Sequence, residues 1–188
     1  LTRRFSALQK VNRCGLITFI TAVGNRKAYT DFDKVEKYLR LTIASLTAQT
    51  SENVKIIVVT NELPSFDPKG ELCEYCLVDF SPPERSKKIN SFSDEQYRIF
   101  MRDKGVRLTA GLLFAQQFSP DYVFFLDCDD WWEPSKLEKQ VPMFRNAKIG
   151  FVYGSYWLEN EMTGTRKIRS LTIDSPGITL DDLLRHNP

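Results

Sequence analysis

Residues 122–132 read Tyr-Val-Phe-Phe-Leu-Asp-Cys-Asp-Asp-Trp-Trp, an apolar run that leads directly into a cluster of aspartates. The apolar run has the length of a buried β-strand. Asp127, Asp129 and Asp130 would then lie at the carboxyl end of that strand, where open α/β sheets bind their ligands. Because neighbouring carboxylates repel one another, the cluster favours a divalent cation, which prefers oxygen ligands. The alternative is an acidic turn in which Asp130 caps a helix that starts near Pro134.

Strand-like and helix-like patterns alternate on both sides of this run, which indicates an α/β domain with a mainly parallel sheet. The strands expected before it cover residues 16–23, 54–59 and 71–80, and the helices cover 31–49 and 94–118. The elements expected after it are a helix from about residue 134, an antiparallel pair of strands over 150–158 and 165–170, and a short helix over 180–185.

Local signals add detail to the two long helices. Thr30 and Asp33 resemble a capping box at the start of the first helix. The second helix should be interrupted or bent near Gly105. Its buried stripe is expected to consist of apolar residues at helical spacing, namely Val106, Ala110, Leu113, Phe114 and Phe118.

Composition limits the classes of protein that remain. The 188 residues carry 26 Lys and Arg against 24 Asp and Glu, and a net charge of +2 is too small to indicate a nucleic acid partner. Hydrophobic residues make up 42% and charged residues 27%, as in a globular domain, so we expect a single domain over residues 1–188. No apolar run approaches the roughly 18 residues of a transmembrane segment. We expect a cytoplasmic protein and leave membrane association open.

Four cysteines are too few for a disulfide framework. Cys73 and Cys76 have the spacing of a zinc or redox pair, but they lie in a stretch that has the pattern of a strand. We therefore interpret them as half-buried strand cysteines.

The segment from Phe125 to Val141 closely resembles the metal-binding DxD segment of family 2 glycosyltransferases of GT-A fold. In that family an apolar strand enters Asp-x-Asp-Asp and is followed by an aromatic residue, a proline and a helix. Further segments resemble the family in the same order, so the resemblance covers most of residues 16–158; these segments are residues 17–22, 38–50, 55–61 and 151–156. The resemblance implies the GT-A fold, a Rossmann-like three-layer α/β sandwich with a mainly parallel sheet.

The resemblance also implies roles for residues that would bind the nucleotide-sugar. Thr21 and Val23 would line the pocket for the base and the ribose. Asn61 stands where the family usually has an aspartate that recognises the base, and this departure leaves the nucleoside open. Arg107, with Lys104 one turn before it, would contact the diphosphate, and the alternative for both is a solvated helix face.

The acidic residues complete the implied donor site. Asp127 would support the nucleotide end, Asp129 would hold the ribose or the metal, and Asp130 would bind the metal, which we expect to be Mn2+ or Mg2+. In the family the general base lies well after the metal loop. The later aspartates are Asp174, Asp181 and Asp182, and none of them can be assigned, so the catalytic residue stays unknown and we expect the acceptor part to be incomplete.

The implied function is a metal-dependent, inverting glycosyltransferase of glycan or polysaccharide synthesis. Its partners would be a nucleotide-diphospho-sugar donor and a glycan, lipid-linked or protein acceptor. One alternative is a haloacid-dehalogenase-like phosphatase, which also ends an apolar strand in Asp-x-Asp, although there the motif normally follows the first strand. Another is a non-catalytic nucleotide-binding module that keeps the fold.

Overall fold

The computed structural model of the protein describes residues 15–50, 53–66, 72–83, 94–146, 156–160 and 163–169. The chain divides into two compact units, residues 1–139 and 140–188. The first unit contains the parallel sheet and its helices, and the second contains a β-hairpin. This division by internal contacts does not test the single domain expected over residues 1–188, which stays a prediction.

The described part of the first unit is built on a four-stranded sheet in the order β3-β2-β1-β4. All neighbouring strands pair in parallel, which confirms the expected mainly parallel sheet. The two central strands are buried on both faces, and they are almost continuously apolar for that reason. The strands are β1 (Ile17–Ala22), β2 (Val54–Thr60), β3 (Cys73–Leu77) and β4 (Tyr122–Phe125).

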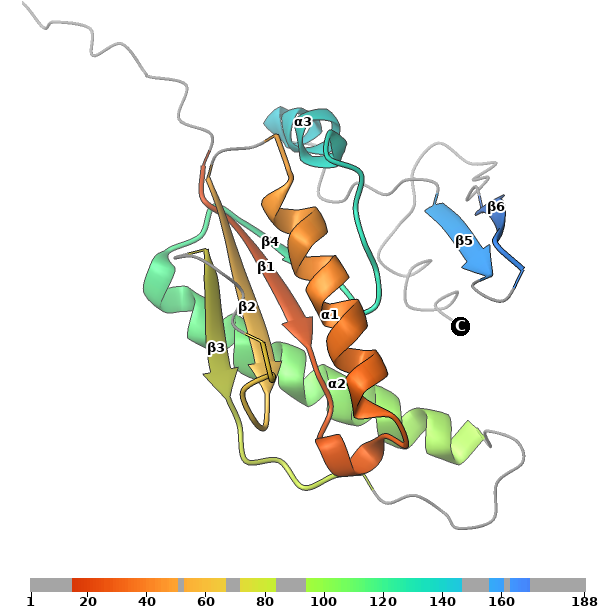
Figure 1. The fold of residues 1–188 in the computed structure, drawn as a ribbon. Helices are drawn as coiled ribbons and strands as arrows, with labels where there is room; N and C mark the ends of the chain where they lie inside the picture. Colours follow the sequence, from red (N-terminus) through yellow and green to blue (C-terminus); the bar gives the residue numbers. More distant parts are fainter. Residues whose placement is uncertain are drawn as a thin grey trace, which may run out of the picture. The chain divides into compact units, whose positions relative to one another are not determined.

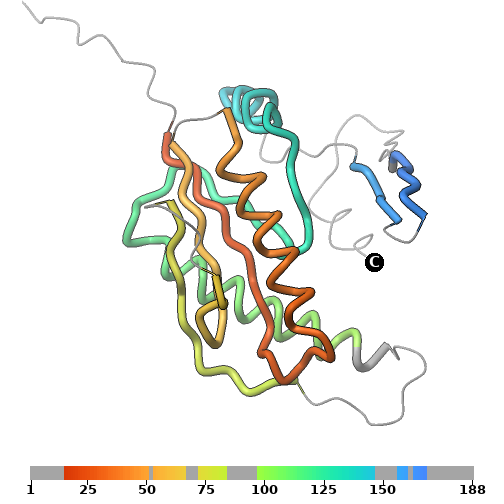
Figure 2. Tube along the Cα trace, in the orientation of Figure 1, coloured from red at the N-terminus to blue at the C-terminus, as the bar shows by residue number. Residues whose placement is uncertain are grey.

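Two long helices cover the sheet, α1 (Phe32–Thr47) on one face and α2 (Asp94–Ala115) on the other (Figure 1, Figure 2). This gives the expected three-layer α/β sandwich. The predicted capping box at the start of α1 is wrong, because Asp31 is the N-cap residue and its carboxylate accepts a hydrogen bond from Lys34 N at 3.0 Å. The predicted interruption near Gly105 is also wrong, because α2 runs through Gly105 without a break.

The side of α2 that faces the sheet differs from the predicted one. Val106 and Leu113 are 47% and 62% exposed, whereas Arg107, Gly111 and Ala115 are buried at successive turns. The cause is a close approach at Gly111, where an added Cβ would lie 2.5 Å from Ile20 Cγ2 and 2.7 Å from Val59 Cγ2. Gly111 of α2 lies directly against β1 and β2, and this contact fixes the rotation of the helix about its axis. The expected packing of Ala110, Phe114 and Phe118 against the core is confirmed.

Gly111→Ala should therefore destabilise the protein, because a methyl group has no room between α2 and the sheet. We expect a loss of about 1–3 kcal/mol in the free energy of unfolding, the usual cost of overpacking. The matched control is Gly105→Ala in the same helix, where an added Cβ meets nothing within 4 Å. It should gain up to about 1 kcal/mol from helix propensity. Urea unfolding measures both changes, and equal effects of the two variants would contradict this packing.

The chain after β4 contains a short helix, α3 (Lys136–Gln140), followed by a 3-10 turn over Val141–Arg145. Leu137 is buried, as expected. Because α3 begins only at Lys136, Asp130 lies outside its first turn, and the helix-cap interpretation of Asp130 is wrong.

In the second unit, β5 (Tyr156–Asn160) and β6 (Thr165–Arg169) form an antiparallel hairpin, which confirms the predicted pairing. The beginning of the strand expected over 150–158 and the helix expected over 180–185 lie outside the described residues. Among the helices that the structure describes, none is long and apolar enough to cross a bilayer.

Candidate functional site

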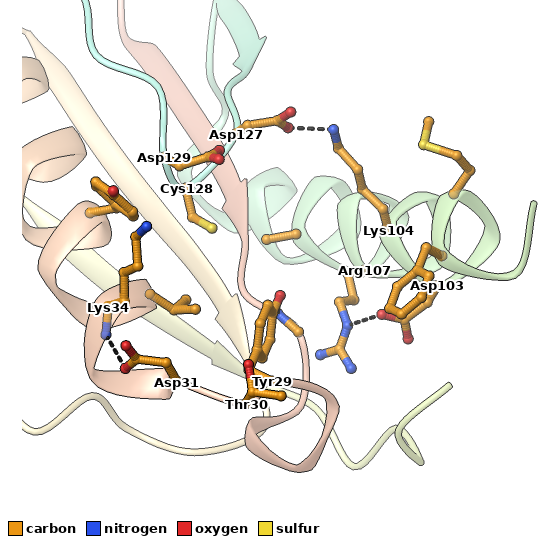
Figure 3. A pocket seen from close by; sticks show the side chains of 16 residues that line it. Tyr29, Thr30, Asp31, Lys34, Asp103, Lys104, Arg107, Asp127, Cys128 and Asp129 are labelled. Carbon is orange, nitrogen blue, oxygen red and sulfur yellow. Dashed lines mark hydrogen bonds and ion pairs between the residues drawn. The ribbon is translucent and has the colours of Figure 1, made fainter. Parts of the chain in front are cut away.

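A cavity of about 460 Å³ lies at the carboxyl ends of β1 and β4 (Figure 3). Its walls come from the end of β1 and the loop after it, the first half of α1, the middle of α2 and the loop after β4. The lining residues are Ala22, Gly24, Tyr29, Thr30, Asp31, Lys34, Val35, Tyr38, Phe100, Met101, Asp103, Lys104, Arg107, Asp127, Cys128 and Asp129.

The loop after β4, residues 127–130, brings its acidic side chains to this cavity. Asp127 and Asp129 line it, and Asp127 forms an ion pair with Lys104 of α2. The pKa of the Cys128 thiol is raised to about 12, first by burial and then by the charges of Asp129 and Asp127. Cys128 is therefore protonated at neutral pH, which makes it a weak nucleophile.

A polar stripe of α1 holds this loop in place. The Thr42 hydroxyl is buried and donates to two carbonyl oxygens of the loop, Cys128 O at 3.0 Å and Asp130 O at 2.6 Å. One turn later, Ser45 Oγ accepts a hydrogen bond from Trp132 N at 3.1 Å. These bonds satisfy main-chain groups of the acidic loop that would otherwise lose their partners on burial.

The stripe continues two residues past the end of α1, to Gln49. Gln49 uses both ends of its amide, because Nε2 donates to Glu133 O at 3.0 Å and Oε1 accepts from Leu137 N at 3.3 Å. The sequence analysis missed these residues. Their signal was available as the polar positions 42, 45 and 49 of a helix, at spacings of three and four beside its apolar face.

Thr42→Val keeps the shape of the side chain but removes the hydroxyl donor. We expect it to lower the free energy of unfolding by about 1 kcal/mol, because two partly buried carbonyl groups lose a hydrogen-bond donor. The control is Thr47→Val, since Thr47 is exposed and its hydroxyl bonds only within the helix, to Ala44 O. That control should stay within about 0.5 kcal/mol of the wild type. Equal urea midpoints for all three proteins would show that the Thr42 bonds do not hold the loop.

Arg107 is 1% exposed, so the solvated-face interpretation is wrong for this residue. Its Nε donates to Asp103 Oδ2 at 2.9 Å, and its Nη1 donates to Val23 O at 3.2 Å and to Asn61 Oδ1 at 2.8 Å. Its Nη2 has no hydrogen-bond partner among the described residues. The Asp103 carboxylate balances the buried charge, and the two N–H groups of Nη2 remain unpaired.

Asn61 is oriented by its two partners. Its Oδ1 accepts from Arg107, and its Nδ2 donates to Phe80 O at 2.8 Å. The same carbonyl accepts from Asn25 Nδ2 at 3.3 Å, so Phe80 joins the loops that follow β1, β2 and β3. An aspartate at position 61 could not donate to Phe80 O, which explains why an amide fits here.

The structure thus brings three of the predicted site residues together, because Arg107, Asp127 and Asp129 all line the cavity. Val23 and Asn61 lie behind it and hold Arg107 in place. The predicted roles of these residues, and those of Thr21 and Asp130, stay predictions. Thr21 is buried in β1, and neither it nor Asp130 is among the lining residues.

Most of the other cavity residues were missed by the sequence analysis, among them Tyr29, Lys34 and Tyr38. Tyr29 belongs to the loop that follows the Gly24-Asn25 turn, and Lys34 and Tyr38 belong to the first turns of α1. Burial raises the pKa of Tyr29, so its hydroxyl is neutral, and it accepts a hydrogen bond from Gly24 N at 3.3 Å.

The fit of a metal ion depends on the exposed carboxylates. Within the described ranges, no group of three or more His, Cys, Asp and Glu side chains could hold a metal ion. Cys73 and Cys76 lie in β3, as expected for strand cysteines. Asp127 and Asp129, however, present carboxylate oxygens at the cavity. This donor set fits a hard cation such as Mg2+, which is commonly bound by one or two carboxylates and takes further oxygens from phosphate and water.

The carboxyl of Asp130 has a pKa above its ordinary value of 3.8, first because of burial and then because of the charges of Asp127 and Asp129. A raised folded-state pKa stabilises the fold fully below the unfolded pKa, and that contribution is lost as the pH rises through the folded pKa. In EDTA, Asp130→Asn should therefore gain stability relative to the wild type as the pH rises from about 4 to about 7. Urea unfolding at a series of pH values measures this difference, and a difference that does not change with pH would contradict it.

Comparison with known proteins gives the following similarities. A family model described as "Glycosyl transferase family 2" matches residues 66–186, a span that contains α2, β4 and the acidic loop. The chain is 30% identical over 135 residues to "Glycosyltransferase GlyA" of Streptococcus pneumoniae, covering 69% of this chain and 16% of that protein.

Two proteins of Escherichia coli are also similar. The chain is 28% identical over 156 residues to "UDP-Glc:alpha-D-GlcNAc-diphosphoundecaprenol beta-1,3-glucosyltransferase WfgD", covering 80% of this chain and 51% of that protein. It is 25% identical over 126 residues to the enzyme of the same description called WfaP, covering 66% of this chain and 43% of that protein. The chain thus spans about half the length, or less, of these curated relatives.

Proposed function

The chain belongs to glycosyl transferase family 2, and we propose that it transfers a sugar from a nucleotide-diphospho-sugar donor to an acceptor hydroxyl. The observation that carries this proposal is the cavity at the carboxyl ends of β1 and β4, with Asp127, Asp129 and Lys104 in its wall. Its volume falls in the range of about 300–1,000 Å³ that is typical of small-ligand sites. The family match to the same loop disfavours the haloacid-dehalogenase-like alternative.

The charged side of the cavity suits the diphosphate. Lys104 lines the cavity, and its side chain is about one-third exposed. It is paired with Asp127 at the surface of the cavity. Arg107 also lines the cavity, and its Nη2 is a buried donor without a partner among the described residues, so a small movement would bring it to the diphosphate. Two donors of this kind can stabilise the negative charge that develops on the departing nucleoside diphosphate.

A divalent cation, Mn2+ or Mg2+, is part of the proposal, because enzymes of this family commonly use divalent metals. Asp129 would hold it from the cavity wall, together with Asp130 at the end of the same loop. The bound cation would neutralise charge on the diphosphate. Thr42 contributes indirectly, because its hydrogen bonds to Cys128 O and Asp130 O fix the backbone that carries both carboxylates.

The reaction that we propose is inverting. It needs a carboxylate that removes the proton from the acceptor hydroxyl on the face opposite to the leaving group. Asp174, Asp181 and Asp182 lie outside the described residues, so the general base stays unassigned.

The names of WfgD and WfaP describe a glucosyl donor, UDP-Glc, and a lipid-linked acceptor. For this chain we propose the wider class, a glycan or lipid-linked acceptor in polysaccharide synthesis, reached from the cytoplasmic face of a membrane. An activity assay with the full-length protein distinguishes this class from the alternatives. Transfer to a protein would identify a protein acceptor, and nucleotide binding without transfer would indicate a purely nucleotide-binding role.

The test of this function is the dependence of nucleotide binding on manganese. Calorimetry with UDP, GDP, CDP, ADP and TDP should find at least one ligand whose affinity rises on adding Mn2+. Asp129→Asn should remove most of that rise, at least about tenfold or about 1.4 kcal/mol, because it removes an anionic ligand while keeping the shape. Asp130→Asn tests the second carboxylate in the same way.

The matched control is Asp33→Asn, which changes an exposed acid in the first turn of α1 that is not among the lining residues of the cavity. It should respond to manganese as the wild type does. An equal manganese response in all of these proteins would contradict the metal assignment. A wild type that binds none of the five nucleotides would contradict the proposed function.

A further inference from the structure

We propose that Lys104 is an exchangeable counterion, which neutralises Asp127 until a divalent cation replaces it and then binds the diphosphate of the donor; this inference rests on the proposed function. Lys104 lies on α2 and forms an ion pair with Asp127, the first carboxylate of the acidic loop (Figure 3). Both side chains line the cavity. The ammonium group thus shields a carboxylate that faces the space for a ligand.

The acidic loop, residues 127–130, needs a positive charge close to it. The pKa of the Asp130 carboxyl is raised first by burial and then by the two other carboxylates of the loop, and the charges of Lys104 and Lys136 act in the opposite direction. The Nζ atom of Lys136 lies over the Trp132 ring, 4.4 Å from its centroid. Lys104, in contrast, forms its ion pair directly with a carboxylate at the cavity.

The two basic residues that α2 brings to the cavity, Lys104 and Arg107, are held in different ways. Arg107 is 1% exposed, and its guanidinium donates to a carboxylate, a main-chain carbonyl and a side-chain amide. The side chain of Lys104 is 37% exposed, and that of its partner Asp127 is 48% exposed. An ion pair that water reaches in this way is weak, and a lysine ammonium group on its flexible stem changes partner readily. Arg107 is therefore the firmly held cation, and Lys104 is the exchangeable one.

The exchange follows from the charges of the ligands. A divalent cation that binds alone has to displace the ammonium group from Asp127, and two cations beside one carboxylate repel each other. A nucleoside diphosphate removes this obstacle, because its phosphate oxygens accept hydrogen bonds from the ammonium group and also bind the divalent cation. Lys104 thus opposes binding of the cation by itself and favours binding of the cation together with the diphosphate. Each ligand then raises the affinity for the other by the same factor.

The test measures the binding of Mn2+ and of the nucleotide separately. The electron paramagnetic resonance signal of free Mn2+ follows the binding of Mn2+ alone, and calorimetry in saturating Mn2+ follows the best of the five nucleoside diphosphates. Lys104→Gln removes the charge and keeps much of the length of the side chain. It should bind Mn2+ alone roughly two- to fivefold more tightly, the scale of an exposed ion pair. It should bind the nucleotide at least about tenfold more weakly, the scale of one hydrogen bond to a charged group.

Matched variants separate this exchange from a general effect of charge. Arg102→Gln removes a positive charge from an exposed position of the same helix that is not among the lining residues, and it should leave both affinities unchanged. Lys104→Arg keeps the charge, so it should not gain affinity for Mn2+ alone. Thermal melts verify that each variant is folded. Lys104→Met, which also removes the charge, carries the test if Lys104→Gln does not fold.

The proposal requires changes of opposite sign in the two affinities. A charge-removing variant of Lys104 in which only one affinity changes, both change in the same direction, or neither changes would overturn it. An equal gain in Mn2+ affinity in Arg102→Gln or in Lys104→Arg would also overturn it. A wild type that binds none of the five nucleotides would instead reject the proposed function, and this inference with it.

Discussion

The hydroxyl of Thr42 is the interaction on which the site depends. It has one proton, which it shares between Cys128 O at 3.0 Å and Asp130 O at 2.6 Å. The acidic loop closes one hydrogen bond of its own, from Asp130 N to Asp127 O at 3.1 Å, but its carboxylates repel one another. Its backbone is also held from outside, by a helix that precedes it by more than eighty residues. The polar stripe of α1 thus fixes the backbone of the acidic loop at the edge of the sheet, although the carboxylates of that loop repel one another.

Arg107 plays the corresponding part on the other side of the cavity. A buried guanidinium is costly unless ion pairs and hydrogen bonds compensate it. Here Asp103 supplies the countercharge, and Val23 O and Asn61 Oδ1 take further donors. Asn61 in turn bonds to Phe80 O, so the ends of three parallel strands meet around one cation. The small residue Gly111, one turn further along α2, allows the helix to lie close enough for these contacts.

The sequence predicted the sheet well because β1 and β2 are continuous apolar runs, and because an aspartate cluster after β4 indicates the ligand-binding edge. It could not predict which side of α2 is buried. Val106 and Leu113 are apolar but exposed, because the contact of Gly111 with Ile20 and Val59 sets the rotation of the helix. Thr42 was missed for a different reason: its polar position beside an apolar helix face is visible in the sequence, but its partners, Cys128 O and Asp130 O, lie more than eighty residues away.

The most direct measurement of the central claim is paramagnetic broadening of backbone amide signals by Mn2+ in the presence of a bound nucleoside diphosphate. If the acidic loop held by Thr42 is the metal and diphosphate site, the signals of Cys128, Asp129 and Asp130 should broaden first, followed by those near Lys104, and the broadening should require the nucleotide. Broadening that is centred elsewhere in the chain, or that is the same without the nucleotide, would contradict the account.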